Sequence, residues 1–344
     1  MESLETEIKS LIKVWITVIL CLTYCYLISR NIPKGTPRLI SILPIIPIFI
    51  SLPLYLSWAL FVGTIAFFIT WLASFKLVLF SFNQGPLSSP SISFQHFISI
   101  ACFPINFKST RNPRSSSPPS SSYLVYALKG LVLVLLVYFS EYRQYVHPSL
   151  VHFMYCIFIY FKLELVLIIT AELVEFFLGL ELEPQFNQPF LSTSLQDFWG
   201  KRWNLMVTGI LRPTIYQPVQ LICVRGFGKR CARLIALLAT FVVSGLMHEL
   251  IVYYVARVWP TWEMTGFFVL HGVSLAVEVE LKRCLGVKYQ LPTFVSGPLT
   301  VGFVLVTGSW LFFPQFLMCG ADVRAIKEYT TIWKSIVGLV KDVK

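Results

Sequence analysis

The stretch that decides the fold runs from Leu234 to Ala256 and reads LIALLATFVVSGLMHELIVYYVA. A helix of this length, rising about 1.5 Å per residue, can cross the roughly 30 Å hydrocarbon core of a bilayer. His248 lies within it, at a depth where an ionisable side chain is costly and is by default a functional candidate. The alternative is a histidine that hydrogen-bonds to a neighbouring helix and takes no part in chemistry.

The composition places the whole chain in a membrane. Of its 344 residues, 56% are hydrophobic and 13% are charged, against roughly 45–50% and 25% in soluble domains. Apolar runs long enough to cross a bilayer recur along the chain, so we predict an all-α, polytopic transmembrane helical bundle with about eight spans. Their approximate bounds are 11–29, 39–57, 58–80, 123–140, 151–172, 234–256, 263–279 and 294–316.

Residues 205–224 are also apolar, but Arg212, Pro213 and Pro218 interrupt them. Proline removes a backbone donor and disrupts a helix interior, so we predict a re-entrant or interfacial segment near 205–224. The chain reads as a single membrane-embedded domain, 1–344, without an internal repeat. Its Ser- and Pro-rich segment, about 104–122, cannot bury enough apolar surface to order itself, which predicts a flexible cytoplasmic loop.

The net charge of +11 is distributed as in a membrane protein and not as in a nucleic-acid-binding one. More than half of the 28 Lys and Arg residues lie in the loops after the first, third, fifth and seventh predicted spans. By the positive-inside rule these loops face the cytoplasm. The lysines near the C-terminus leave open which side of the membrane holds that end. Because Glu2, Glu5 and Glu7 precede the first span, we expect it to be kept and not cleaved as a signal peptide.

The cysteines give no sign of a metal site or a disulfide framework. The eight of them are scattered, with no Cys-x-x-Cys pair and no spacing typical of zinc ligands. Buried cysteine usually behaves as a small hydrophobic residue. We therefore expect no structural zinc, no other metal and no disulfide.

The residues around His248 favour a role in chemistry. Ser244 lies one helical turn before it on the same face, and Gly245 leaves room for a close approach by a substrate or another backbone. Glu249 is turned about 100° away around the helix. The span places His248 roughly 20 Å from the cytoplasmic surface, where a reaction would be shielded from water. His271 is the second intramembrane histidine, and for it we favour a hydrogen bond to a neighbouring helix.

A second cluster, DFWGKRWN, lies upstream and ends at Asn204. Its aromatic and cationic residues suit a membrane interface and phosphate groups: Trp199, Trp203, Lys201 and Arg202. The same residues also fit an aromatic belt with positive flanks. Asn204 fits that alternative less well because it heads an apolar run, where an amide can donate to a developing oxyanion or orient a histidine.

Together with Arg212-Pro-Thr-Ile-Tyr216 and Ser244-Gly-Leu-Met-His-Glu249, this cluster resembles the membrane-bound O-acyltransferase superfamily. The resemblance covers nearly the whole chain and, within the superfamily, points to the plant wax synthase group. It implies a multi-pass protein of the endoplasmic reticulum membrane that takes acyl-CoA as co-substrate, without another cofactor, and a lipid alcohol as acceptor. The family's essential histidine matches His248 and its partner asparagine matches Asn204. We expect substrate-binding roles for Asp197, Trp199, Trp203, Lys201, Arg202 and Ser244.

The resemblance thus predicts an acyltransferase that esterifies a long-chain fatty alcohol to a wax ester, with His248 as general base. A sterol acceptor is the alternative within the family. A transporter using Lys162, Glu164 and Glu172 is the alternative from another class, although no internal repeat supports it, and a lipid-binding scaffold is a third. The sequence leaves open the acceptor, the acyl chain length, the exact number of spans and the oligomeric state.

Overall fold

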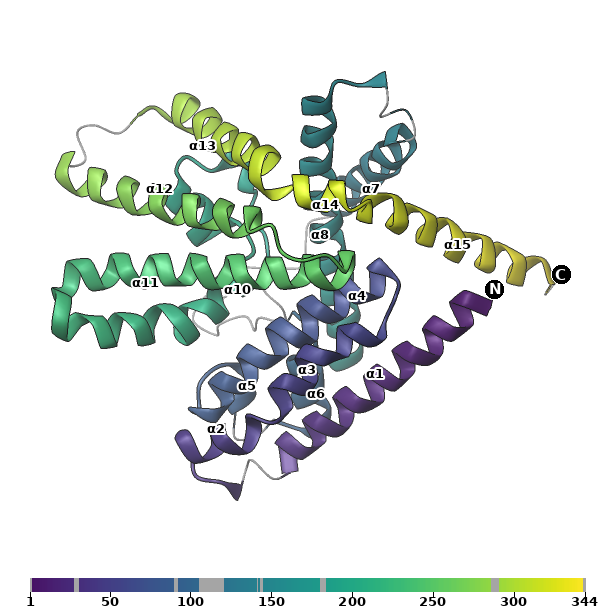
Figure 1. The fold of residues 1–344 in the computed structure, drawn as a ribbon, viewed down its shortest axis with the longest axis horizontal. Helices are drawn as coiled ribbons and strands as arrows, with labels where there is room; N and C mark the ends of the chain where they lie inside the picture. Colours follow the sequence, from purple (N-terminus) through teal and green to yellow (C-terminus); the bar gives the residue numbers. More distant parts are fainter. Residues whose placement is uncertain are drawn as a thin grey trace. The chain divides into compact units, whose positions relative to one another are not determined.

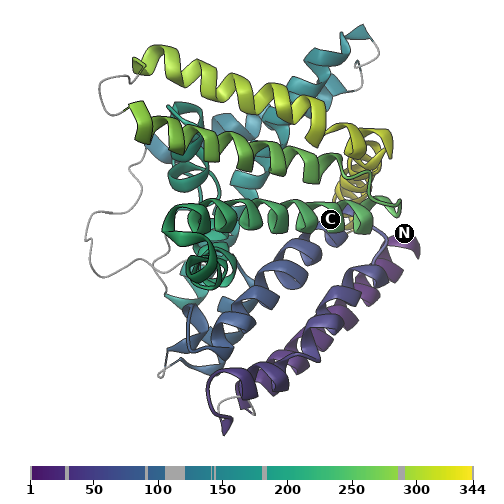
Figure 2. The same cartoon turned by 60° about the vertical axis from the view of Figure 1, so that its left-hand side comes forward.

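The computed structural model describes residues 2–27, 31–89, 92–104, 121–140, 142, 145–179, 184–285 and 291–342 (Figure 1, Figure 2). Every regular element within these residues is a helix, which confirms the all-α prediction. Apart from its ends, the loop predicted to be flexible, about 104–122, lies outside the described residues.

The chain forms two compact units, and each combines segments that are distant in the sequence. The first unit comprises Met1–Phe103, Ile210–Thr265 and Gln315–Lys344, and the second comprises Pro104–Gly209 and Gly266–Pro314. The assignment of the whole chain to one domain remains a prediction.

The first unit is built around a continuous helix, 59–81, that consists of α4, η3 and α5. Its neighbours include α6, the long α11 and the C-terminal α15, and α1 packs against α6. The elements of this unit are α1 (Glu2–Leu27), α2 (Thr36–Ile42), α3 (Ile45–Ser51), η2 (Leu52–Tyr55), α4 (Ala59–Ile65), η3 (Ala66–Ala73), α5 (Ser74–Ser81), η4 (Pro86–Ser88), α6 (Phe94–Cys102), η8 (Arg212–Tyr216), α11 (Gln217–Ala256), α14 (Pro314–Met318) and α15 (Ala321–Asp342).

The second unit carries the remaining helices. They are α7 (Ser121–Ser140), α8 (Pro148–Leu178), η6 (Pro189–Leu191), α9 (Leu195–Asp197), η7 (Phe198–Arg202), α10 (Leu205–Leu211), α12 (Glu263–Leu285), α13 (Thr293–Thr307) and η10 (Gly308–Phe312). The last two residues of α10 and the first turn of α12, up to Thr265, belong to the first unit. An ion pair joins α7 to α8, because the ammonium group of Lys129 contacts both carboxylate oxygens of Glu164 at 2.7 and 2.8 Å.

Within the described residues, six helical stretches are long and apolar enough to cross a membrane. They are Leu4–Leu27, Thr36–Tyr55, Ala59–Ser81, Leu205–Ala256, Glu263–Leu285 and Thr293–Phe312. The other two predicted spans, 123–140 and 151–172, correspond to helices α7 and α8, and the apolar part of α7, Leu124–Phe139, is shorter than the six. The chain is therefore a multi-pass membrane protein.

The stretch Leu205–Ala256 is a helical hairpin. Gly228 interrupts α11 with φ 72° and ψ 168°, and Figure 1 shows the chain turning back at this point. Glycine adopts a positive φ without the steric cost that other residues have. The break expected at Pro213 is instead a π-helical turn, η8, that continues the helix. Residues 205–224 are thus helical, and their re-entrant or interfacial placement remains a prediction.

The start of α4 is held by two carboxylates from opposite ends of the chain. Glu7 accepts hydrogen bonds from the backbone N–H groups of Ser57 and Trp58 at 2.8 and 2.9 Å. Glu328 accepts from the backbone N–H groups of Ala59 and Leu60 at 2.8 and 3.0 Å. The first N–H groups of a helix have no partner within it and carry partial positive charge, so anions stabilise them. α1 and α15 are thereby fixed to the same helix end.

Cations bind backbone carbonyl groups in the same unit. Arg324 donates to the carbonyl oxygen of Val255 near the end of α11 at 2.8 Å. The buried ammonium group of Lys76 donates to the carbonyls of Ile100 and Phe103, at the end of α6, at 2.6 Å each. Buried charges are tolerated when such bonds satisfy them.

We expect Glu328→Gln to destabilise the protein, because the amide can accept only through its oxygen and carries no charge. Hydrogen bonds to charged groups contribute about 1.5–3 kcal/mol each. Thermal unfolding of the detergent-solubilised protein should show a lower midpoint for this variant. Lys327→Ala, at an exposed neighbouring position, is the control, and an equal midpoint for Glu328→Gln and the parent protein would contradict the assigned role.

Candidate active site

His248 lies on α11, and a bond to its own helix fixes which ring nitrogen is basic. Its Nδ1 atom is 2.7 Å from the carbonyl oxygen of Ser244. A carbonyl oxygen can only accept, so Nδ1 carries the hydrogen and donates it. In the neutral ring Nε2 is then the nitrogen with the lone pair. This is the tautomer that a general base acting through Nε2 requires.

The imidazole of His248 packs against Trp71 of the π-helical segment η3. The ring centroids are 5.3 Å apart and the planes meet at 76°, an edge-to-face contact. Trp71 is 2% exposed. π-Helical turns inside α-helices occur frequently at functional sites, and this one brings an aromatic ring to the predicted base.

The residues beside His248 join α11 to the first turn of α12. A carboxylate oxygen of Glu249 accepts a hydrogen bond from the N–H of Thr265 at 3.0 Å. A Cβ atom added to Gly245 would lie 2.9 Å from the Cα atom of Thr265. The close approach predicted at Gly245 is thus made by another backbone. Ser244 is buried and contacts His248 through its carbonyl group, while its predicted contact with substrate remains a prediction.

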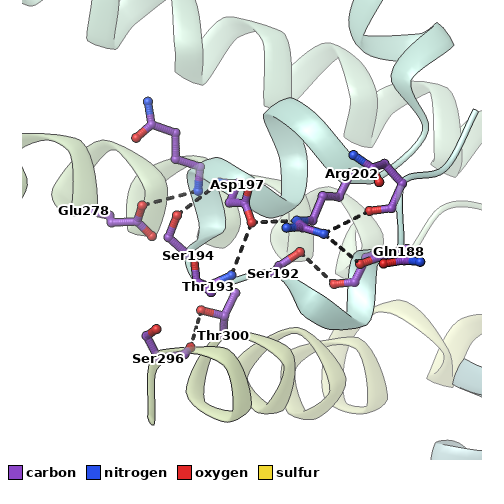
Figure 3. A network of polar contacts seen from close by, with 12 residues as sticks. Gln188, Ser192, Thr193, Ser194, Asp197, Arg202, Glu278, Ser296 and Thr300 are labelled. Atoms are coloured by element: carbon purple, nitrogen blue, oxygen red, sulfur yellow. Dashed lines mark hydrogen bonds and ion pairs between the residues drawn. The ribbon is translucent and has the colours of Figure 1, made fainter. Parts of the chain in front are cut away.

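The cluster that ends at Asn204 is held in shape by its own charges (Figure 3). A carboxylate oxygen of Asp197 accepts from the guanidinium of Arg202 at 2.7 Å and from the N–H of Thr193 at 3.3 Å. Arg202 also donates to the carbonyls of Asn187 and Gln188, at 3.2 and 3.3 Å. Both charged groups therefore hold the loop before η7, and their contact with substrate remains a prediction.

A carboxylate from another helix anchors this cluster, and one of its lysines is exposed to the surroundings. The carboxylate of Glu278, on α12, accepts from the N–H groups of Leu195 and Gln196 at the start of α9 (Figure 3). Lys201 is exposed. Of the two cations predicted to meet phosphate groups, Lys201 is therefore the one that faces away from the protein.

Trp199 is hydrogen-bonded to the second intramembrane histidine. Its indole N–H lies 3.1 Å from Nδ1 of His271, and Nε2 of His271 lies 2.8 Å from the hydroxyl of Thr307. An indole N–H can only donate, so Nδ1 of His271 accepts and Nε2 carries the hydrogen. Thr307 in turn donates to the carbonyl of Phe303 at 2.7 Å. The hydrogen bond to a neighbouring helix that we favoured for His271 is present, and it joins η7, α12 and α13.

Trp203 and Asn204 end the cluster in different environments. Trp203 stacks on Phe198 with ring centroids 5.3 Å apart. Asn204 is 8% exposed and has φ 40°, a left-handed conformation that asparagine tolerates better than most residues. Its side-chain oxygen accepts from the N–H of Val207 at 3.4 Å and caps α10. The role of its amide nitrogen as a donor to substrate remains a prediction.

The structure keeps the two predicted catalytic residues in different units. His248 and Ser244 belong to the first unit, whereas Asp197, Asn204 and the residues between them belong to the second. The pairing of His248 with Asn204 therefore remains a prediction. Nothing in the sequence singles out Trp71 as a neighbour of His248, because a tryptophan within an apolar run carries no distinguishing signal. Lys76 does carry one, its position inside an apolar span, and the structure shows it bound to carbonyls at the end of α6.

Comparison with known proteins shows which family the chain resembles. The model of the membrane bound O-acyl transferase family matches residues 182–270, which include every predicted site residue. The chain is 43% identical to a long-chain-alcohol O-fatty-acyltransferase of Simmondsia chinensis, over 98% of this chain and 99% of that protein. The chain belongs to the membrane-bound O-acyltransferase family.

Two relatives from Arabidopsis thaliana differ in the acceptor that their names give. The probable long-chain-alcohol O-fatty-acyltransferase 3 is 44% identical over 90% of this chain and 91% of its own length. The acyl-CoA–sterol O-acyltransferase 1 is 43% identical over 94% of this chain and 95% of its own length. The similarity to these proteins therefore does not separate a straight-chain alcohol from a sterol.

We expect His271→Ala to destabilise the protein, because it leaves the indole N–H of Trp199 unpaired and opens a space beside it. An unsatisfied buried donor costs about 1–3 kcal/mol. Thermal unfolding in detergent should show a lower midpoint, with His152→Ala, a half-buried histidine on α8, as the control. A His271→Ala protein as stable as the parent would contradict the hydrogen-bonded chain.

Proposed function

We propose that this chain transfers a fatty acyl group from acyl-CoA to the hydroxyl of a long-chain alcohol and so forms a wax ester, with His248 as general base. The observation that carries the proposal is the bond from Nδ1 of His248 to the carbonyl of Ser244, which makes Nε2 the proton acceptor. The names of two relatives similar over most of the chain support the donor and acceptor classes.

The reaction needs one proton acceptor and one oxyanion donor. Nε2 of His248 takes the proton of the alcohol while the alcohol oxygen attacks the thioester carbonyl. The side-chain amide of Asn204 donates to the oxyanion that develops, as a preorganised donor can in a site that excludes water. The carbon–sulfur bond then breaks, and the CoA thiolate takes the proton back from His248. The step needs no covalent acyl-enzyme and no metal.

The remaining predicted residues have supporting roles. Asp197 and Arg202 preserve the shape of the loop before η7, and Trp199 and Trp203 pack it. Lys201 attracts the phosphate groups of CoA, together with the exposed cations at the turn of the helical hairpin, Arg225, Lys229 and Arg230. Ser244 orients the base through its carbonyl group. We place the enzyme in the endoplasmic reticulum membrane, with these cations on the cytoplasmic side.

A sterol acceptor is the second candidate, because one relative of similar identity and coverage is named an acyl-CoA–sterol O-acyltransferase. A panel of fatty alcohols and sterols, assayed with one acyl-CoA, separates the two acceptors. The transporter alternative has less support. Glu164, one of its proposed proton carriers, is held by Lys129 in an ion pair between α7 and α8.

We expect microsomes that contain the protein to form labelled ester from labelled acyl-CoA and a long-chain alcohol, and His248→Ala to lose this activity. Removal of a general base costs about 10²–10⁴-fold in rate. His152→Ala should keep most of the activity, and quantification of the solubilised protein checks that His248→Ala is produced and inserted. A fully active His248→Ala enzyme would refute the assignment of the base.

Asn204→Ala extends the same experiment to the second unit. The loss of one oxyanion donor costs about 10²–10³-fold in kcat. If Asn204 and His248 act as a unit, the double variant should be little worse than His248→Ala alone. Losses that multiply in the double variant would show that the two residues act independently.

A further inference from the structure

Trp71 carries a buried donor that the protein itself does not use. Its indole nitrogen Nε1 is buried and, within the described residues, has no hydrogen-bond partner. The large majority of buried side-chain polar atoms in proteins are paired. An unpaired N–H is costly, because the bond to water is lost and none replaces it. The contacts that the structure describes do not explain why an unpaired donor is kept at this position.

This donor lies beside the proposed base. The rings of Trp71 and His248 meet edge to face with centroids 5.3 Å apart, and both residues belong to the first unit. Nδ1 of His248 is committed to the carbonyl of Ser244. The contact between the two rings is therefore one of packing, and it sets the indole that carries the unpaired N–H against the imidazole of the proposed base.

The segment that carries Trp71 is held on several sides. Phe67 packs against the indole edge to face, with centroids 5.4 Å apart. The hydroxyl of Thr70 donates to the carbonyl of Phe49 at 2.7 Å and ties η3 to α3. The hydroxyl of Ser74 donates to the carbonyl of Ile69 at 3.4 Å. A donor fixed in this way needs no reorganisation when charge develops in front of it.

We propose that Trp71 is a further catalytic residue, whose indole N–H donates a hydrogen bond to the carbonyl oxygen of the acyl thioester. The inference rests on the proposed function, with His248 as the base. The carbonyl oxygen is the partner, because negative charge develops on it during attack and strengthens the bond in the transition state. A donor to the alcohol oxygen would instead withdraw electron density from the nucleophile.

The step balances without any further reactant. The alcohol oxygen forms a bond to the carbonyl carbon and gives its proton to Nε2 of His248. The electron pair of the carbon–sulfur bond leaves with sulfur, and the thiolate takes the proton from Nε2. Trp71 keeps its hydrogen throughout and only stabilises the tetrahedral oxyanion between the two events.

The sharpest test replaces the N–H and nothing else. Benzothienylalanine, incorporated at position 71, puts sulfur in place of the indole N–H and keeps the shape of the side chain. We expect kcat to fall about 10²-fold, the loss of one oxyanion donor, with little change in KM for acyl-CoA. Because no bond within the protein is lost, the thermal midpoint without substrate should stay the same or rise. A merely structural tryptophan would show an unchanged kcat.

Two further variants complete the test. Trp71→Phe should also lower kcat, whereas Trp58→Phe, which replaces the indole of a buried tryptophan that stacks on Phe61 in the same unit with a phenyl ring, should keep it within a few-fold. Full kcat in the benzothienylalanine protein, beside an inactive His248→Ala, would overturn the role of Trp71 and leave the proposed function intact. An active His248→Ala would instead remove the base on which both proposals rest.

Discussion

Helix ends leave N–H and C=O groups that lipid cannot satisfy, and this protein binds several of them with buried or half-buried charged side chains. Carboxylates bind the starts of helices: Glu7 and Glu328 at α4, Glu249 at α12 and Glu278 at α9. Cations bind carbonyls at helix ends: Lys76 at α6 and Arg324 at α11. This pairing fixes the helices within each unit, and so it fixes the surroundings of His248.

Against this pattern, the residues proposed for chemistry stand out because their functional atoms are not used at helix ends. Nδ1 of His248 bonds within its own helix and leaves the ring basic at Nε2. Its neighbour Glu249 is turned toward α12 and caps it. The indole nitrogen of Trp71 is a buried donor without a partner among the described residues. The proposed base and the proposed oxyanion donors are thus distinct from the groups that hold the helix ends.

The sequence predicted the helices and singled out His248 as the candidate base because both depend on local signals. Apolar runs of bilayer length gave the spans, and an imidazole inside such a run gave His248. Residues 205–224 were harder, since Pro213 breaks a regular α-helix but is accommodated in the π-helical turn η8. The partners of Trp199 and His271 come from different helices, so only tertiary packing reveals that they bind each other. The unpaired N–H of Trp71 has no local signal at all.

The proposed mechanism depends on the tautomer of neutral His248, whose proton sits on Nδ1 and leaves Nε2 as the base. Solid-state ¹⁵N NMR of the ¹⁵N-histidine-labelled protein in lipid bilayers tests this directly, with the His248 signals assigned by their loss in His248→Ala. We expect a protonated Nδ1 and an unprotonated Nε2, because Nδ1 donates to the carbonyl of Ser244. A neutral ring with its hydrogen on Nε2 would contradict it, because that nitrogen could not then accept the proton of the alcohol.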